Sequence, residues 1–328
     1  MATHDHDGHE HDDHDSHDHG HEHFGPADAA TLATREGVRA TWISLGGLGV
    51  TAVMQMAVVA ISGSVALLAD TIHNVTDALT AIPLLIAFRL GRRPPTRRYP
   101  YGYHRAEDVA GLVIVAMILL SAVLAGVEAV RRLARPEPID AVGWVLAAGL
   151  IGFAGNEAVA TYRMRVGRRI GSAALVADGQ HARADGLTSL GVVLSALGAI
   201  AGIDRADAVV AIAITAAIVV TLVRAARAIL HRALDGTDEA TIALIETVAA
   251  AVDGVEHVTD ARARWSGHRL LADLCVIVEP TISVSDGHRI ADDVRGSLLH
   301  EVPRLADATV HVDPHDHESH AGGTAASA

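Results

Sequence analysis

The sequence predicts an α-helical membrane protein that carries a small soluble α+β domain near its C-terminal end. Half of the 328 residues are hydrophobic and only 20% are charged, proportions that suit a membrane protein better than an ordinary soluble domain. Long apolar stretches separated by polar connections occupy the chain up to about residue 230, and an alternating pattern of shorter elements follows. These features together indicate a helical bundle in the bilayer with a soluble domain attached to it.

Six apolar stretches are long enough to cross a bilayer, which requires about 20 mostly apolar residues. They cover residues 40–61, 66–88, 109–130, 141–162, 174–202 and 207–230. The connection between the first two is very short, so these two stretches are expected to form an antiparallel hairpin. The sequence therefore predicts six transmembrane helices.

The arginines predict how the helices are oriented in the membrane. They concentrate in the loops at 89–105 and 163–169 and at the end of the sixth stretch, whereas the alternate loops contain fewer. Basic residues are enriched on the cytoplasmic side of membrane proteins. Both termini are therefore expected to be cytoplasmic, although the cluster at 131–135 runs against this rule.

The remaining segments complete the predicted domain organisation. Helix-like patterns at 238–252 and 285–301 and strand-like runs at 255–265, 270–278 and 307–312 predict an α+β sandwich with helices on one sheet face. The predicted divisions are a disordered His- and Asp-rich tail at 1–34, a transmembrane domain at 35–234, a cytoplasmic α+β domain at 235–313 and a disordered tail at 314–328.

Several functional classes are not supported by the sequence. The single cysteine, Cys275, rules out an intrachain disulfide and a CxxC metal motif. No basic stripe with interleaved aromatic residues is present, so nucleic acid is not an expected partner. The chain has no phosphate-binding G-x-x-x-x-G-K-[ST] motif, which argues against direct use of ATP. We expect neither an enzyme nor an organic cofactor.

One pattern occurs twice, each time within a predicted membrane helix. Residues 69–77 read A-D-T-I-H-N-V-T-D and residues 177–185 read A-D-G-Q-H-A-R-A-D, so both follow A-D-x-x-H-x-x-x-D. Positions three and four apart share one face of a helix. Each pattern therefore forms a polar stripe. The stripes are Asp70, His73 and Asp77 in the second stretch and Asp178, His181 and Asp185 in the fifth.

Ionisable side chains at membrane depth are costly and indicate function. Two imidazoles and two carboxylates make a suitable tetrahedral set for Zn²⁺. The four candidate ligands are His73, Asp77, His181 and Asp185. A proton relay could use the same residue types, and a purely structural polar network is a further alternative.

Four segments of the sequence resemble the cation diffusion facilitator family of zinc-exporting antiporters. They are S-G-S-V-A-L-L-A-D-T-I-H-N-V-T-D, Y-P-Y-G-Y-H-R-A-E, S-A-A-L-V-A-D-G-Q-H-A-R-A-D-G-L-T-S and the terminal V-H-V-D-P. The resemblance covers about residues 40–313. It implies six transmembrane helices, a ferredoxin-like cytoplasmic domain and a homodimer. By the same resemblance, the four candidate ligands match the family's transport site, and Asp70 and Asp178 match positions outside the ligand set.

The resemblance also implies sites outside the membrane. Residues that match the family's regulatory zinc site are Cys275, His288, His311, Asp313 and His315. The alternative is that Cys275 belongs to a strand core and His311 to the surface. In the loop before the third stretch, Tyr99 and Tyr103 stand where many members have histidine, so this loop is not expected to bind metal. Arg105 and Asp235 match a pair that joins the two domains in relatives.

The predicted function is proton-coupled export of Zn²⁺, or a similar divalent cation, from the cytoplasm across the cell membrane. Ligands must lose protons to bind metal, so loading and unloading change the proton count of the site. The rival interpretation is a membrane-anchored metal sensor or buffer that binds metal without moving it. That interpretation explains the His-rich tail, but it gives no reason for His–Asp pairs at membrane depth.

Overall fold

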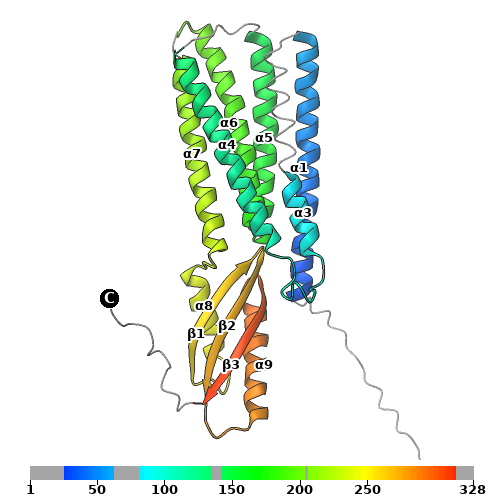
Figure 1. Cartoon of the computed structure of the whole chain (residues 1–328), viewed down its shortest axis with the longest axis vertical. Helices are drawn as coiled ribbons and strands as arrows, with labels where there is room; N and C mark the ends of the chain where they lie inside the picture. The colour runs from blue at the N-terminus through cyan, green and yellow to red at the C-terminus, as the bar shows by residue number, and fades with distance from the viewer. Residues whose placement is uncertain (1–25, 63–80, 135–141, 204–205, 315–328) are drawn as a thin grey trace, which may run out of the picture.

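The computed structural model describes residues 26–62, 81–134, 142–203 and 206–314, and its helices form an elongated bundle above the α+β domain (Figure 1). The bundle helices are α1 (Pro26–Ser62), α3 (Ala81–Gly91), α4 (Ala106–Ala134), α5 (Val142–Ile170), α6 (Ala173–Ile200) and α7 (Ala206–Ala233). All of these helices except α3 are long and apolar enough to cross a membrane. The protein is therefore a multi-pass membrane protein, as its sequence predicts.

The first predicted stretch differs most from the observed helix. Helix α1 begins at Pro26, inside the segment 1–34 that was expected to be a disordered tail. The apolar count marks only the part of a helix that lies in lipid, so it misses a polar first turn. Helix α3 corresponds to the end of the predicted 66–88 stretch, and residues 63–80 lie outside the described part of the chain.

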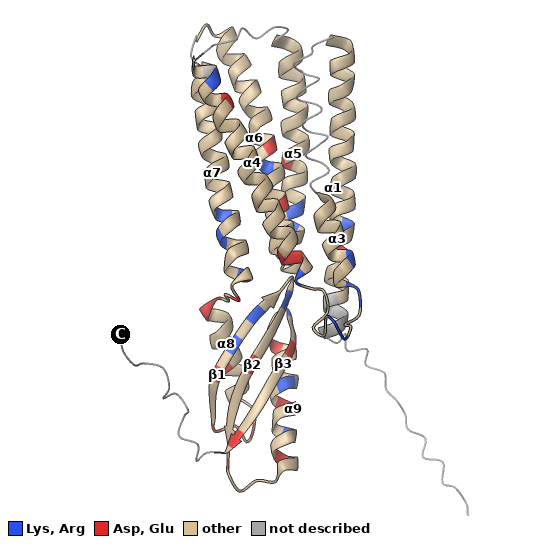
Figure 2. Cartoon of the chain, in the orientation of Figure 1, with Lys and Arg blue, Asp and Glu red and all other residues tan. Residues whose placement is uncertain are grey.

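Charged side chains are sparse in most of the bundle and frequent in the domain below it (Figure 2). Apolar side chains instead cover the outside of the long helices, where Val53, Leu120 and Val209 are more than half exposed. In water such a surface would be unfavourable, whereas in lipid it is matched by the surrounding hydrocarbon. The distribution places the bilayer around the upper part of the bundle.

Helices α5 and α6 pack closely because small residues line their contact. A Cβ atom built on Gly179 would lie 2.7 Å from Met164 Cγ and 3.0 Å from the Ala160 carbonyl oxygen. The tight turn between the helices uses Gly171, whose φ of 78° is readily adopted only by glycine. Small residues at such contacts let two helix backbones approach each other in a membrane. This packing holds one face of α6 firmly against α5.

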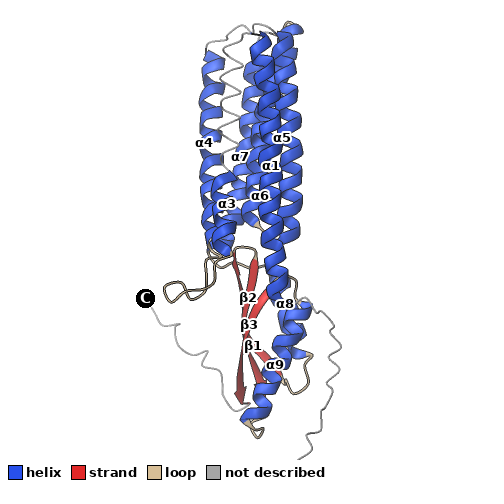
Figure 3. Cartoon of the chain, turned by 90° about the vertical axis from the view of Figure 1, so that its right-hand side faces the viewer, coloured by secondary structure: helices blue, strands red, loops and turns tan. Residues whose placement is uncertain are grey.

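The C-terminal domain is a three-stranded sheet with both helices on one face (Figure 3). Its elements are α8 (Glu239–Ala250), β1 (His257–Ser266), β2 (Arg269–Val278), α9 (Val284–Glu301) and β3 (Leu305–Pro314). The central strand β2 pairs antiparallel with β1 and parallel with β3. Val276, Val294 and Leu298 are buried where the sheet meets the helices. The predicted helix-strand-strand-helix-strand order is confirmed.

The turn between β1 and β2 inserts into the lower end of the bundle. His268 Nδ1 lies 2.8 Å from the Glu107 carboxylate of α4, and its Nε2 lies 3.2 Å from the Thr34 hydroxyl of α1. The Gly267 amide donates a hydrogen bond of 3.1 Å to Asp108. His268 and Glu107 are both almost completely buried. Polar contacts therefore join the soluble domain to two membrane helices at once.

Candidate metal site

His181 and Asp185 lie one turn apart in the buried middle of α6. Ser172 caps the start of this helix by accepting a 3.0 Å hydrogen bond from the Leu175 amide. His181 Nδ1 lies 3.8 Å from Asp185 Oδ1, and the two residues are only 2% and 5% exposed. The helix periodicity and the small residues of α5 together place both side chains inside the bundle. Two potential metal ligands thus sit side by side at membrane depth.

His73 and Asp77, the other two candidate ligands, lie outside the described residues. The contribution of His73 and Asp77 to the four-residue site therefore stays a prediction. Within the described ranges, no group of three or more His, Cys, Asp and Glu side chains is arranged to hold a metal ion. A complete tetrahedral site would accordingly need ligands from outside the described residues, which is where His73 and Asp77 lie.

Asp178, the first acidic residue of the repeated pattern, forms an ion pair with Arg163 of α5. The distance from Arg163 Nη1 to Asp178 Oδ2 is 3.0 Å, and the two side chains are 1% and 0% exposed. Arg163 was interpreted from the sequence as one of several loop arginines, because apolar content does not show which arginines point inward. The structure instead places it within the bundle against Asp178, which lies one helical turn before His181 on α6.

A second charged pair joins the same two helices. The Arg183 guanidinium contacts the Glu157 carboxylate through Nη2, and its Nε donates a 3.0 Å hydrogen bond to Glu157 Oε2. Thr161 donates to the same carboxylate at 3.1 Å. Both members of this pair are about one-third exposed, unlike Arg163 and Asp178. Glu157 of α5 is thus bound to Arg183 of α6 across the helix contact.

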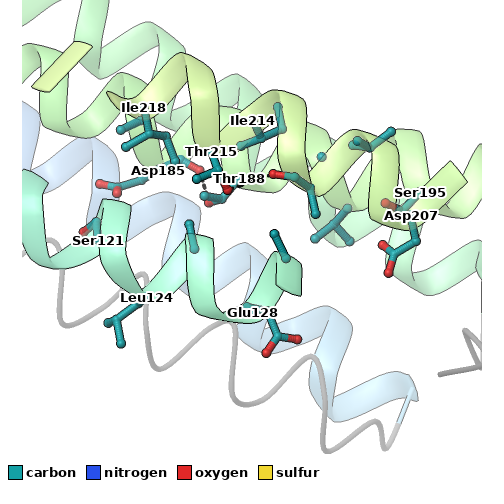
Figure 4. Close-up of a pocket in the computed structure, with 17 residues that line it drawn as sticks. Ser121, Leu124, Glu128, Asp185, Thr188, Ser195, Asp207, Ile214, Thr215 and Ile218 are labelled. Atoms are coloured by element: carbon teal, nitrogen blue, oxygen red, sulfur yellow. Dashed lines mark hydrogen bonds between the residues drawn. The ribbon is translucent and has the colours of Figure 1, made fainter. Parts of the chain in front are cut away.

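Asp185 also borders a pocket of about 260 Å³ between α4, α6 and α7 (Figure 4). Ser121 lies near Asp185, whereas Ser195 and Asp207 lie toward the opposite end of the pocket. That end corresponds to the last turns of α6 and the first turn of α7, far from the α+β domain (Figure 1). The pocket thus provides a partly polar route from Asp185 toward the far side of the bundle. Sequence reasoning missed it because the lining residues are dispersed over three helices.

The cytoplasmic candidate residues come together only in part. The Cys275 thiol donates a 3.0 Å hydrogen bond to Asp313 Oδ2, and His311 Nε2 donates at 2.9 Å to Asp313 Oδ1. Strand pairing explains this, because Cys275 of β2 stands opposite His311 of β3. His288 instead contacts Asp292 at 3.4 Å on α9, and His315 lies outside the described residues.

Two effects hold the Cys275 thiol in its protonated form. Burial of the side chain and its hydrogen bond to Asp313 raise the pKa of Cys275 to about 11. Metal ions bind the thiolate, so a raised pKa opposes binding at neutral pH. The trio of Cys275, His311 and Asp313 offers suitable atoms but is organised as a hydrogen-bonded chain through Asp313.

Side chains of the loop before α4 contact one another and the start of β2. The rings of Tyr99 and Tyr103 pack with centroids 4.7 Å apart. His104 Nε2 lies 2.7 Å from Arg269 Nη1, and an arginine can only donate, so His104 accepts as a neutral ring. Burial, together with the charges of Arg269 and His268, lowers the pKa of His104 to about 4. The His104 ring therefore joins the loop to the turn between β1 and β2.

The expected contact between Arg105 and Asp235 is present at the same junction. Arg105 Nη2 donates to Asp235 Oδ1 at 2.6 Å, and both side chains are about half exposed. The structure brings them together because the end of α7 returns the chain to the start of α4.

Comparison with known proteins places both parts of the chain in one group of proteins. Residues 41–231 match the model of the cation efflux transmembrane domain, and residues 237–315 match that of the cation efflux protein cytoplasmic domain. The probable cation efflux system protein Rv2025c of Mycobacterium tuberculosis (strain ATCC 25618 / H37Rv) is 52% identical over 299 residues. That alignment covers 91% of this chain and 90% of the relative.

Two more distant relatives align over most of their length. The cation-efflux pump FieF of Klebsiella pneumoniae is 30% identical, with 77% of this chain and 84% of the relative covered. The manganese efflux system protein MneS of Bacillus subtilis (strain 168) is 26% identical, with 76% and 86% covered.

Proposed function

The chain belongs to the cation diffusion facilitator family of cation efflux transporters, and from this membership we propose that it exports Zn²⁺ in exchange for protons. The observation that carries the proposal is the buried pair of His181 and Asp185 in α6. Such a pair has no structural advantage over apolar residues at membrane depth, because burying ionisable groups is costly. Binding a cation that crosses the membrane would explain why His181 and Asp185 are buried there.

The proposed transport site combines His181 and Asp185 with His73 and Asp77. The repeated A-D-x-x-H-x-x-x-D pattern supports this combination, since each copy supplies one imidazole and one carboxylate. Two nitrogen and two oxygen ligands suit tetrahedral Zn²⁺, whereas Mn²⁺ prefers octahedral oxygen sites. One relative is named for manganese efflux, which makes Mn²⁺ the competing substrate. The imidazole content of the site favours Zn²⁺.

Proton exchange follows from the chemistry of the ligands. Imidazoles and carboxylates bind metal only after losing their protons, so metal and protons compete for the same atoms. The pocket that reaches Asp185 from the far end of the bundle supports an exit for the metal and an entrance for protons on that side. An inward proton gradient would then drive metal out of the cell.

Orientation and assembly complete the proposal. The arginine-rich loop at 89–105 and the exposed Arg165, Arg168 and Arg169 in the last turns of α5 support a cell membrane location with both termini in the cytoplasm. The match to the family's cytoplasmic domain at 237–315 supports a homodimer. A second Zn²⁺ site in this domain is a weaker candidate, because Cys275, His311 and Asp313 lie together but would have to give up their hydrogen bonds and rearrange to surround a metal ion.

Metal flux into sealed vesicles that contain the purified protein tests the proposal. Replacing His73, Asp77, His181 or Asp185 singly by alanine is expected to abolish Zn²⁺ flux while the protein still reaches the membrane. The exposed Asp253, replaced by asparagine, is a control for loss of one carboxylate. Normal flux in Asp185→Ala would contradict the site. Zn²⁺ binding without flux in the wild type would favour the sensor or buffer.

A further inference from the structure

The ion pair of Arg163 and Asp178 is almost completely buried in the contact between α5 and α6. Its two charged groups are 3.0 Å apart and have 1% and 0% exposed side chains. Removing two charges from water costs several kcal/mol for each ion, and a single ion pair only partly offsets that cost. Apolar residues of similar volume would stabilise the same contact as well, so a need other than stability explains the pair.

Asp178 occupies a position from which it could become a metal ligand. It precedes His181 by three residues and Asp185 by seven, so all three lie on one face of α6. Side chains three residues apart on a helix are neighbours, with Cβ atoms about 5–6 Å apart. A carboxylate at this position adds oxygen atoms next to the proposed Zn²⁺ site.

The ion pair leaves part of the bonding capacity of both residues unused. Among the described residues, both Asp178 carboxylate oxygens and Arg163 Nε and Nη2 have no hydrogen-bond partner, although all four atoms are buried. Asp178 Oδ2 faces Arg163 in the ion pair, and Oδ1 has no contact of that kind. A buried polar atom without a hydrogen-bond partner is destabilising and calls for an explanation. Asp178 Oδ1 therefore has lone pairs that a metal ion could use. The negative charge of the same carboxylate is paired with the positive charge of Arg163.

We infer that Arg163 is a specificity-determining residue, which withholds Asp178 from the metal and so keeps the transport site at four ligands. This inference rests on the proposed function, since it requires His181 and Asp185 to be ligands. The fixed guanidinium charge repels a cation from the Asp178 carboxylate and holds one of its oxygens. The metal is then left with the imidazole-rich tetrahedral set that suits Zn²⁺.

Loss of the guanidinium would change which metals fit. Asp178 could then bind as a fifth ligand and add one or two oxygens to the site. Mn²⁺ favours more oxygen ligands and a higher coordination number than Zn²⁺ does. Replacement of Arg163 by an uncharged residue should therefore raise Mn²⁺ binding relative to Zn²⁺. A merely structural role for the pair predicts lower stability with no change in metal preference.

Metal binding to the purified full-length protein, measured separately with Zn²⁺ and Mn²⁺, tests the inference. Arg163→Gln is expected to raise the Mn²⁺:Zn²⁺ affinity ratio about tenfold, the scale typical of changes next to metal ligands. The double variant Arg163→Gln with Asp178→Asn should return the ratio to the wild-type value. The exposed Arg165 on the same helix, replaced by glutamine, is the matched control and should leave the ratio unchanged.

An unchanged ratio in folded Arg163→Gln, or a raised ratio that persists in the double variant, would overturn the inference. Should Arg163→Gln fail to fold, Arg163→Lys weakens the contact while keeping a charge. It should raise the ratio about threefold, a gain that Asp178→Asn cancels, and folded protein without this gain would also overturn the inference.

The His181→Ala variant separates the inference from the proposed function. If this variant binds and carries Zn²⁺ normally, the transport site itself is wrong. If it loses Zn²⁺ while Arg163→Gln keeps the wild-type ratio, only the role of Arg163 is wrong.

Discussion

The two groups of candidate metal ligands differ most in their surroundings. In the bundle, the His181 and Asp185 side chains are 2% and 6% exposed, and their distance of 3.8 Å is too long for a hydrogen bond. In the α+β domain, the His311 and Asp313 side chains are 71% and 37% exposed and are joined by a 2.9 Å hydrogen bond. The same residue types are thus buried and not hydrogen-bonded to each other in one region, and partly solvated and hydrogen-bonded to each other in the other.

This difference shows why burial is the better guide to function here. An exposed His–Asp pair costs little to maintain, since water solvates both groups, and it needs no further explanation. A buried pair is maintained against a large desolvation cost. The membrane pair therefore carries the functional proposal, whereas the exposed pair of His311 and Asp313 is equally compatible with a strand edge that has ordinary surface contacts.

The largest expected effect separates the two regions directly. Asp185→Asn removes the charge of a proposed ligand and should lower Zn²⁺ flux in vesicles by a factor of about 100 or more. Asp313→Asn makes the same chemical change in the soluble domain and should alter flux less than about threefold. Similar losses in both variants, at equal expression, would show that the soluble site is as essential as the membrane site.

A smaller effect is expected at the junction between the domains, where one pair is buried and one is exposed. His268→Ala leaves the buried Glu107 carboxylate without its partner and should destabilise the junction by about 3 kcal/mol. Asp235→Ala breaks the half-exposed contact with Arg105 and should cost less than about 1 kcal/mol. Thermal unfolding and protease sensitivity of the purified variants measure the two destabilisations. Equal shifts would mean that burial does not distinguish the two pairs.

The protonation of Cys275 gives a third prediction, which concerns metal binding in the soluble domain. Its pKa is about 11, so the thiol stays protonated near neutral pH and becomes a thiolate only as the pH rises toward that value. Metal binding to Cys275 should therefore strengthen with pH, by up to about tenfold per unit. Zn²⁺ binding to a His181→Ala variant, measured between pH 7 and 9, checks this.

The influence of Asp313 on the same thiol can be measured separately. Asp313→Asn removes a carboxylate that raises the Cys275 pKa, so alkylation of the thiol at pH 8 should become severalfold faster. Asp273→Asn, an exposed change on β2, the strand that contains Cys275, is the control. Identical alkylation rates in Asp313→Asn and wild type would show that Asp313 does not raise the pKa of Cys275 and that burial alone does so.

The smallest effect is expected in the loop before α4. Changing Tyr99 and Tyr103 together to phenylalanine keeps their packed rings and removes only the hydroxyls. Zn²⁺ flux should stay within about twofold of wild type, because tyrosine is a poor zinc ligand and the loop is not expected to bind metal. A complete loss of flux with normal expression would reveal a role for these hydroxyls.

The order of elements was predictable because its signals are local. Apolar stretches of sufficient length mark membrane helices, and alternating patterns mark the strands of the soluble domain. The repeated A-D-x-x-H-x-x-x-D pattern identified His181 and Asp185 because helix periodicity alone brings them to one face. The early start of α1 at Pro26 was missed because polar helical turns outside lipid leave no apolar signal.

The sequence by itself determined the membrane character, the element order and the polar stripe on α6, all of which depend on spacing along one chain. Only the tertiary structure decided that Arg163 faces inward to Asp178, that His268 enters the bundle beside Glu107, and that Asp185 borders a pocket. These contacts join residues of separate elements. Their formation depends on how α5 and α6 pack and on where the turn between β1 and β2 docks, and no spacing along the chain encodes either.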